Sequence, residues 1–164
     1  MDVNQDELER LAAQLGRALV LRHWRLAAAE SCTGGWAAQA MTAVAGSSDW
    51  FERGFVTYSN DAKQDLLDVS GRVLVESGAV STETAREMAE GALRHSRAQC
   101  AFAITGVAGP GGGSEEKPVG TVCFAWARNG AATEVDRQRF DGDRRQVRAQ
   151  SVRHALSRML ALVT

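Results

Sequence analysis

The fold of this 164-residue chain depends on one segment, Leu26-Ala27-Ala28-Ala29-Glu30-Ser31-Cys32-Thr33-Gly34-Gly35. It opens with a short apolar run and closes with two glycines, and an alanine-rich helical pattern begins near Trp36. This order predicts a strand, a tight turn and a helix N-terminus. The hydroxyls of Ser31 and Thr33 would then lie beside free backbone N–H groups, where an anion or a developing oxyanion is stabilised. Serine and threonine are also common helix N-caps, so this segment alone leaves both interpretations open.

Helical and strand patterns alternate on both sides of this segment. Apolar spacing and capping residues predict helices at 6–22, at 35–44, after Ser59-Asn60-Asp61, after Gly78-Ala79-Val80-Ser81 and from Asp143 onward. Apolar and β-branched runs predict strands at 26–29, 50–58, 100–104, 119–127 and 133–140, the last two joined at Asn129-Gly130. We therefore expect a three-layer α/β/α fold. Its sheet would be mixed and mostly parallel, with about five strands and a C-terminal β-hairpin.

Length and composition predict one domain over residues 1–164. The chain is 45% hydrophobic, which suits a single core. Its formal net charge of -1 gives no reason to expect a nucleic acid or an acidic membrane as partner. From the acidic N-terminus we expect no signal peptide, and no apolar run approaches membrane-spanning length. Three widely spaced cysteines form neither a disulfide framework nor a metal-ligand pattern, so we expect a cytoplasmic protein.

A second unusual segment is rich in glycine: Thr105-Gly106-Val107-Ala108-Gly109-Pro110-Gly111-Gly112-Gly113-Ser114. It follows the apolar run 100–104, and the end of a buried strand is where α/β folds bind ligands. Glycine lets backbone N–H groups approach a phosphate, although the spacing fits neither a P-loop nor a dinucleotide-binding motif. A flexible linker has a similar composition, but Pro110 and Pro118 stiffen this segment and favour a ligand-binding loop.

A nucleophilic Ser31 would need a general base. The histidines lie on predicted helices or at helix ends, away from the loops: His23, His95 and His154. A Ser-His-Asp triad is therefore disfavoured, whereas a Ser-Lys pair remains available because burial can lower the pKa of a lysine. Lys63 follows a strand end, Tyr58 and a helix N-cap, so it is either this base or an ordinary surface lysine. Cys32 is a competing nucleophile, since a thiol at a helix N-terminus has a lowered pKa.

Four segments together resemble the CinA C-terminal-domain family, whose stand-alone members are nicotinamide-nucleotide amidohydrolases. They are 29–35, Thr57-Tyr58-Ser59-Asn60 with Lys63, Gly78-Ala79-Val80-Ser81, and 105–120. The resemblance extends over residues 26–145, with the segments in the family's order and spacing. It covers only the amidase portion of the longer, two-domain members of the family.

The resemblance implies hydrolysis of the carboxamide of nicotinamide mononucleotide to nicotinate mononucleotide and ammonia, with no metal or organic cofactor. Ser31 would be the nucleophile, and Lys63 with Tyr58 would supply the base. Backbone N–H groups at residues 32–34 would stabilise the oxyanion, and the glycine loop with Ser114 or Lys117 would hold the phosphate. The implied substrate-binding residues are Glu30, Cys32, Thr33, Gly34, Gly35, Thr105, Gly106, Gly109, Gly112, Gly113, Ser114 and Lys117. The implied partners are a small pyridine nucleotide and a second copy of the chain in a homodimer.

Two other functions fit parts of the sequence. A nucleotide-binding regulatory module would retain the pocket without turnover, but it has no need of a nucleophile and a base. A phosphate-ester hydrolase would need acidic metal ligands, which the loops lack. If the glycine loop does not hold the phosphate, Arg144 and Arg145 at the start of the last helix are the next candidates.

Overall fold

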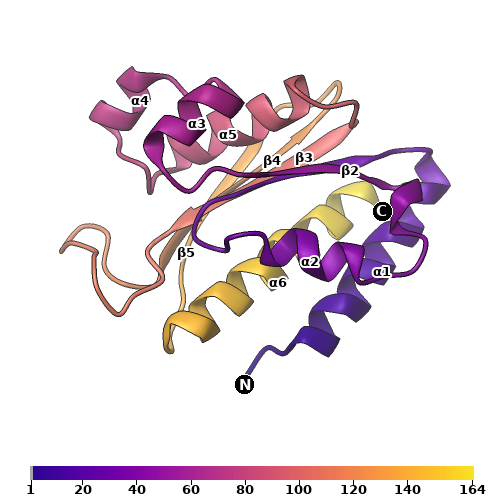
Figure 1. The fold of residues 1–164 in the computed structure, drawn as a ribbon, viewed down its shortest axis with the longest axis horizontal. Helices are drawn as coiled ribbons and strands as arrows, with labels where there is room; N and C mark the ends of the chain where they lie inside the picture. The colour runs from indigo at the N-terminus through magenta and orange to yellow at the C-terminus, as the bar shows by residue number, and fades with distance from the viewer. Residues whose placement is uncertain (1) are drawn as a thin grey trace.

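The computed structural model describes residues 2–164, in which one five-stranded sheet lies between two layers of helices (Figure 1). The elements are α1 (Gln5–Arg22), β1 (Leu26–Glu30), α2 (Trp36–Thr42), a 3-10 turn (Ser47–Asp49), β2 (Phe51–Val56), α3 (Asn60–Leu67), α4 (Gly71–Glu76), α5 (Thr82–Arg94), β3 (Cys100–Gly106), β4 (Thr121–Arg128), β5 (Glu134–Arg139) and α6 (Arg144–Val163). Helices α3, α4 and α5 cover one face of the sheet, and α1, α2 and α6 cover the other. The predicted α/β/α fold with a mixed sheet is confirmed.

The strand order β2-β1-β3-β4-β5 places the candidate loops next to one another. Strand β1 pairs in parallel with both β2 and β3, whereas β4 is antiparallel to β3 and to β5. Only β4 therefore runs against the other strands. Because β2, β1 and β3 are parallel neighbours, the loops that follow Val56, Glu30 and Gly106 begin at the same edge of the sheet.

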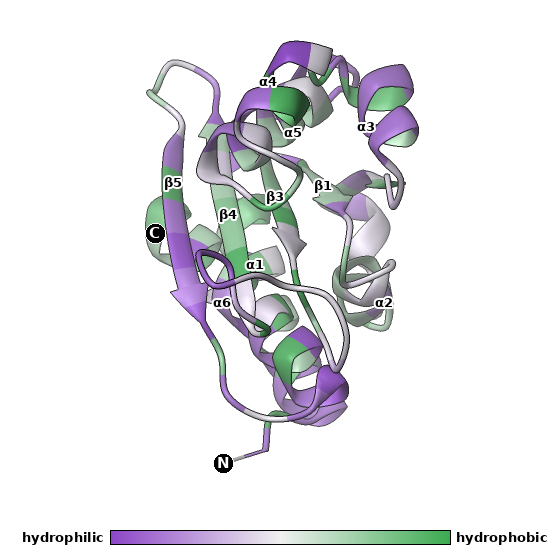
Figure 2. Cartoon of the chain, turned by 90° about the vertical axis from the view of Figure 1, so that its left-hand side faces the viewer, coloured by the Kyte–Doolittle hydropathy of each residue, from purple (hydrophilic) through white to green (hydrophobic). Residues whose placement is uncertain are grey.

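The three central strands present different side chains to the two helical layers. Their side chains alternate between the faces, as strand geometry requires. The face toward α1 and α6 carries mostly large residues: Leu26, Ala28, Cys100, Phe102, Ile104, Val122, Phe124 and Trp126. The face toward α5 carries only small ones: Ala27, Ala29, Ala101, Ala103, Cys123, Ala125 and Ala127. Strand β5 is largely hydrophilic (Figure 2), as expected of the sheet edge that it forms.

Several helices begin at the capping residues that the sequence predicts. Asn4 accepts the N–H of Glu7 at the start of α1, and Ser59 caps α3. Asp143 and Gln146 form a reciprocal capping box at the start of α6. No helix among residues 2–164 has the length and apolar character needed to cross a bilayer.

Helix α4 was not expected from the sequence. Ser70 caps it by accepting the N–H of Val73, but its six residues are too few to show a helical apolar period. The segment between α3 and α5 is therefore a short helix rather than only a loop.

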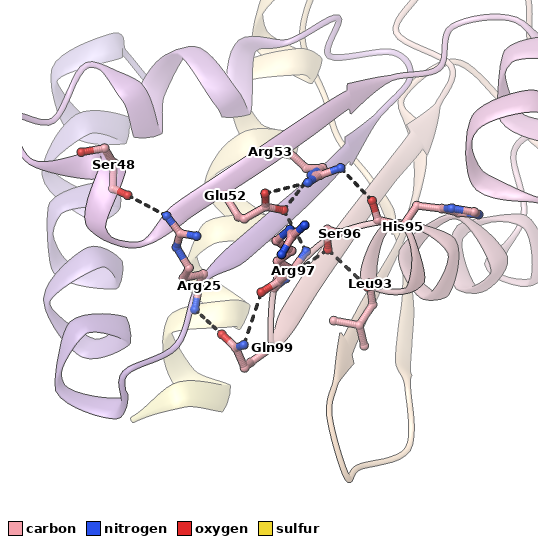
Figure 3. A network of polar contacts seen from close by, with 10 residues as sticks. Arg25, Ser48, Glu52, Arg53, Leu93, His95, Ser96, Arg97 and Gln99 are labelled. Carbon is pink, nitrogen blue, oxygen red and sulfur yellow. Dashed lines mark hydrogen bonds and ion pairs between the residues drawn. The ribbon is translucent and has the colours of Figure 1, made fainter.

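A network of hydrogen bonds joins the amino ends of the strands, at the end of the sheet opposite the candidate loops (Figure 3). The backbone N–H of Arg25, just before β1, donates to the side chain of Gln99, just before β3, at 2.7 Å. Glu52 at the start of β2 accepts from the side chain of Arg53 at 2.7 Å and from the backbone of Arg97 at 3.0 Å. The hydrogen bond from Arg53 lowers the pKa of the Glu52 carboxyl. These contacts fix the loops at the amino ends of β1, β2 and β3.

Helix α5 packs against the end of α3, the helix that carries Lys63, at a position that admits no side chain. A Cβ atom on Gly91 would lie 2.0 Å from the carbonyl oxygen of Leu67.

We expect Gly91→Ala to lower the free energy of unfolding by about 1–3 kcal/mol, because overpacking outweighs the better helix propensity of alanine. Urea denaturation followed by circular dichroism measures this. In the matched control, Gly111→Ala, the new methyl meets nothing within 4 Å, so stability should stay within about 0.5 kcal/mol. Equal stability of the two variants would contradict this account of the α3–α5 contact.

Candidate active site

Ser31, Lys63 and Tyr58 surround one cavity at the carboxyl edge of the sheet. The cavity has a volume of about 230 Å³ and is lined by Ser31, Cys32, Tyr58, Asn60, Lys63, Ala79, Val80, Thr105, Gly106, Ala108 and Arg144. Most of these residues come from the segments after β1, β2 and β3, and the others come from the loop between α4 and α5 and from the start of α6. The parallel pairing of the three strands brings them together.

Lys63 is buried and points at Ser31. Only 1% of the residue is exposed, and its Nζ lies 3.0 Å from Ser31 Oγ, 2.9 Å from the carbonyl oxygen of Thr57 and 3.2 Å from that of Tyr58. Burial lowers the pKa of the Lys63 amine. A neutral amine has two N–H groups and one lone pair. Two carbonyls can take the N–H groups, which leaves the lone pair for the hydroxyl of Ser31. The surface-lysine interpretation is wrong.

Of the backbone N–H groups at residues 32–34, which were expected to stabilise an oxyanion, two are free. Ser31 N–H donates to the carbonyl of Ile104 at 2.9 Å, and Gly34 N–H donates to the carbonyl of Ser31 at 3.0 Å. The N–H groups of Cys32 and Thr33 form no hydrogen bond within the described chain, residues 2–164. These two groups are the candidate oxyanion donors. Gly34 was expected to donate as well, but its N–H is already used to close the turn.

Glu30 fills the N-terminus of α2 from inside the protein. The residue is 1% exposed, and its carboxylate accepts the Thr33 hydroxyl at 2.7 Å, Ala37 N–H at 2.8 Å and Ala38 N–H at 3.0 Å. The helix N-terminus therefore binds an anion, as its free N–H groups favour, but the anion is the protein's own side chain. Glu30 and the Thr33 side chain shape the turn and do not line the cavity. Gly35 has a φ of 102° at the N-cap position, a conformation that favours glycine.

Arg148 of α6 holds the same turn from the other side. Its Nε and Nη2 donate to the carbonyls of Cys32 and Thr33, each at 3.0 Å. In a trans peptide the N–H points away from the carbonyl, so this contact directs the N–H of Thr33 away from α6. The guanidinium also lies over the Trp36 ring, 5.5 Å from its centroid. Arg148 was missed in the sequence because it is 116 residues from Cys32, and no local pattern marks it.

Thr105 and Gly106 begin the glycine loop, and they are placed at the cavity as expected. The hydroxyl of Thr105 donates to the carbonyl of Ala79 at 2.8 Å, which attaches the 78–81 segment to the end of β3. A Cβ on Gly106 would lie 2.7 Å from the side chain of Val122, so only glycine fits beside β4.

Beyond Ala108, which also lines the Ser31 cavity, the glycine loop does not reach it, contrary to expectation. The segment between β3 and β4 extends beyond the sheet (Figure 1). The predicted binding residues that do not line the cavity are Gly109, Gly112, Gly113, Ser114 and Lys117. Ser114 and Lys117 close a turn with each other, in which Ser114 N–H donates to the Lys117 carbonyl at 2.9 Å. The Lys117 amine donates to the carbonyl of Ser77, next to α4. The glycine-rich composition predicts a loop here, but it does not predict the direction in which the loop runs.

Tyr58 lies at the mouth of the cavity and is 61% exposed. Its hydroxyl is 3.3 Å from Nη2 of Arg144, and it has no hydrogen bond to Ser31 or Lys63. The carbonyl of Tyr58, not its phenol, contacts the Lys63 amine. The structure therefore brings Tyr58 to the site without placing its hydroxyl in reach of the nucleophile.

Cys32 is not an activated thiol, which corrects the sequence-based expectation. Burial, with a further contribution from the charge of Glu30, raises the pKa of Cys32 to about 12. The positive end of α2 does not lower it, because Glu30 already occupies that end. The histidines lie elsewhere, as predicted: His95 pairs with Asp68, and His154 is 2.8 Å from Asp136.

Comparison with known proteins identifies the family of this chain. The CinA C-terminal domain family model matches residues 8–163. The chain belongs to the CinA C-terminal-domain family. It is 51% identical over 154 residues to the nicotinamide-nucleotide amidohydrolase PncC of Escherichia coli K12, covering 94% of this chain and 93% of that protein. It is 48% identical to the PncC of Pseudomonas putida, covering 97% and 99% of the two chains.

Solved structures place the CinA family fold over the whole chain. The crystal structure of the competence/damage inducible protein CihA from Agrobacterium tumefaciens has a TM-score of 0.94 and 44% identity, covering 100% of this chain and 99% of that one. A CinA superfamily protein from Escherichia coli has a TM-score of 0.91 and 38% identity, covering 99% of each chain.

The three cysteines should be inert in the native protein. Burial raises the pKa to about 12 for Cys32 and Cys100 and to about 11 for Cys123. At about pH 8 all three are protonated thiols, and the thiolate is the reactive form. We expect no rapid reaction with Ellman's reagent in the folded state. All three thiols should react after unfolding in guanidinium chloride, which serves as the control. A fast-reacting native thiol would restore Cys32 as a competing nucleophile.

Proposed function

We propose that this protein hydrolyses the carboxamide of nicotinamide mononucleotide, giving nicotinate mononucleotide and ammonia. Relatives named nicotinamide-nucleotide amidohydrolase cover nearly the whole chain at 48–51% identity. The observation that carries the proposal is the buried Lys63 amine, 3.0 Å from the hydroxyl of Ser31. This pair is the minimum machinery for covalent hydrolysis of an amide without a histidine.

In the first half of the proposed reaction, Lys63 takes the proton of the Ser31 hydroxyl as Oγ attacks the carboxamide carbon. The oxyanion that forms faces the free N–H groups of Cys32 and Thr33. Lys63, now an ammonium, gives its proton to the amide nitrogen, the C–N bond breaks, and ammonia leaves. An ester between Ser31 and the nicotinoyl group remains.

In the second half, water replaces ammonia. Lys63 takes a proton from the water as its oxygen attacks the ester carbon, and the same N–H groups stabilise the second oxyanion. The ester C–O bond then breaks, Lys63 returns its proton to Ser31 Oγ, and nicotinate mononucleotide leaves. Both halves use the same two residues and return them to their starting state.

The carbonyls of Thr57 and Tyr58 support the base through both halves. They lie 2.9 and 3.2 Å from Nζ and accept two of its N–H groups in either protonation state. When Lys63 is protonated, they also stabilise the positive charge, and the third N–H points to the reacting atoms. Tyr58 thus assists through its backbone in this scheme, while its phenol contacts Arg144.

A regulatory module that binds the nucleotide without turnover is the second hypothesis. Such a binder gains nothing from a buried, uncompensated amine facing a serine hydroxyl. Ammonia release from nicotinamide mononucleotide by the purified protein separates the two hypotheses. Binding of the nucleotide with no ammonia above background would favour the regulatory module.

Ser31→Ala should abolish turnover. Loss of a covalent nucleophile costs on the order of a thousandfold or more in rate. The measurement is ammonia release, with Ser96→Ala at the opposite edge of the sheet as the matched control that keeps the wild-type rate. Activity above about a tenth of wild type in Ser31→Ala would replace the serine with direct attack by water.

Lys63→Arg should be nearly as damaging as Lys63→Ala, because arginine keeps its proton and cannot act as a base. The matched control is Arg72→Lys, the reverse exchange at an α4 side chain that is 81% exposed, which lies outside the Ser31 cavity and should keep the wild-type rate. A near-normal rate in Lys63→Arg would leave Lys63 a merely structural role.

The wild-type pH profile should report the lowered pKa of Lys63. Below that pKa the amine is protonated and cannot accept the proton of Ser31; above it the amine is neutral. We therefore expect kcat/KM to rise with pH through an inflection below the usual lysine value of 10.5. A kcat/KM that falls with pH over this range would contradict the assignment.

A further inference from the structure

A second, larger cavity adjoins the Ser31 cavity. Its volume is about 1060 Å³, and its lining includes Trp36, Pro110, Arg145 and Arg148. The two cavities share Ala108 and Arg144, so they meet at the mouth where Tyr58 lies. A ligand seated at Ser31 can therefore extend directly into the larger cavity.

Three arginines of this cavity have no acidic partner. Arg144, Arg145 and Arg148 form no salt bridge within residues 2–164. Asp143 also lines the cavity, but its carboxylate accepts the N–H of Gln146 at 2.9 Å as the cap of α6. Because the whole chain has a net charge of -1, this concentration of positive charge is local.

The same arginines retain many unused donors. Arg144 gives two of its five N–H groups to the Gly109 carbonyl and the Tyr58 hydroxyl. Arg148 gives two to the carbonyls of Cys32 and Thr33. The side chain of Arg145 makes no hydrogen bond within the described chain, residues 2–164. All four acceptors are neutral, so an anion would find three full positive charges and free N–H groups.

We propose that the three arginines bind the 5′-phosphate of the nucleotide substrate. This inference rests on the proposed function, because it assumes a carboxamide at Ser31. Arg148 contacts the turn that carries Ser31, and Arg144 contacts the hydroxyl of Tyr58, so both are anchored to the catalytic cavity. A phosphomonoester is the ligand class that suits such a cluster, since planar guanidinium groups bind its oxygens in pairs.

In this proposal the phosphate binds to arginines of α6 rather than to the glycine loop. Gly112, Gly113 and Ser114 are exposed and line neither cavity. The loop contributes Pro110 to the wall, and its Gly109 carbonyl holds Arg144 at 2.7 Å. The glycine loop then positions Arg144 and does not itself bind the phosphate.

The test is binding of ribose 5-phosphate, measured by isothermal titration calorimetry in a Ser31→Ala background. Arg145→Met should weaken binding about tenfold or more, the effect of losing one charge-assisted contact. The Arg145 guanidinium forms no hydrogen bond with another residue among residues 2–164, so its removal should not disturb the fold. The matched control is Arg153→Met on the same helix, where the arginine pairs with Glu7 at 3.4 Å; affinity should stay within about twofold.

Kinetics give a second readout in the protein with Ser31 intact. Arg145→Met should raise KM for nicotinamide mononucleotide about tenfold with little change in kcat, because a distant phosphate contact acts mainly on binding. Nicotinamide riboside, which lacks the phosphate, should show a much smaller effect.

Three results would overturn the proposal. One is equal affinity of the Arg145→Met and Arg153→Met proteins for ribose 5-phosphate. Another is loss of binding in Gly112→Val but not in Arg145→Met, which would return the phosphate to the glycine loop. The third is no binding of ribose 5-phosphate to the Ser31→Ala protein in the millimolar range. If wild-type protein released no ammonia from the nucleotide, the proposed function would fail, but the titration would still test the arginine site.

Discussion

The buried amine of Lys63 is the constraint on which the site depends. A lysine with almost no exposed surface is unfavourable unless each of its polar groups has a partner. Here the partners are two backbone carbonyls and the hydroxyl of Ser31, supplied by the segments after β2 and β1. They meet only because those strands are parallel neighbours. The close packing of α5 on α3 at Gly91 and on the alanine face of the sheet keeps this arrangement in place.

The turn around Ser31 is held by two internal charges before any ligand arrives. Glu30 satisfies the N-terminus of α2 on one side, and Arg148 takes two carbonyls of the turn on the other. What remains free are the N–H groups of Cys32 and Thr33, beside the nucleophile. A site whose donors are fixed in advance has little reorganisation to undergo during reaction. The same internal use of Glu30 explains why Cys32 is not activated.

The sequence predicted local structure well and long-range contacts poorly. Caps such as Asn4, Ser59 and Asp143 act within three residues, so their helices began as expected. Helix α4 was too short for its apolar period to appear. The course of the glycine loop and the role of Arg148 both depend on contacts between residues that are far apart in the sequence. In the case of Arg148 the separation is more than a hundred positions, and no local pattern encodes such a pair.

The sequence by itself determined the α/β/α class, the alternation of large and small residues in the central strands, and the candidate pair of Ser31 and Lys63. These follow from periodicity, capping and residue type, which are local properties of the chain. Only the tertiary structure decided the protonation chemistry: it buried Lys63 against two carbonyls and buried Cys32 beside Glu30. It also gathered Arg144, Arg145 and Arg148 beside the catalytic cavity. The physical reason is that desolvation and charge proximity depend on distances across the fold, which only the packing of helices on the sheet establishes.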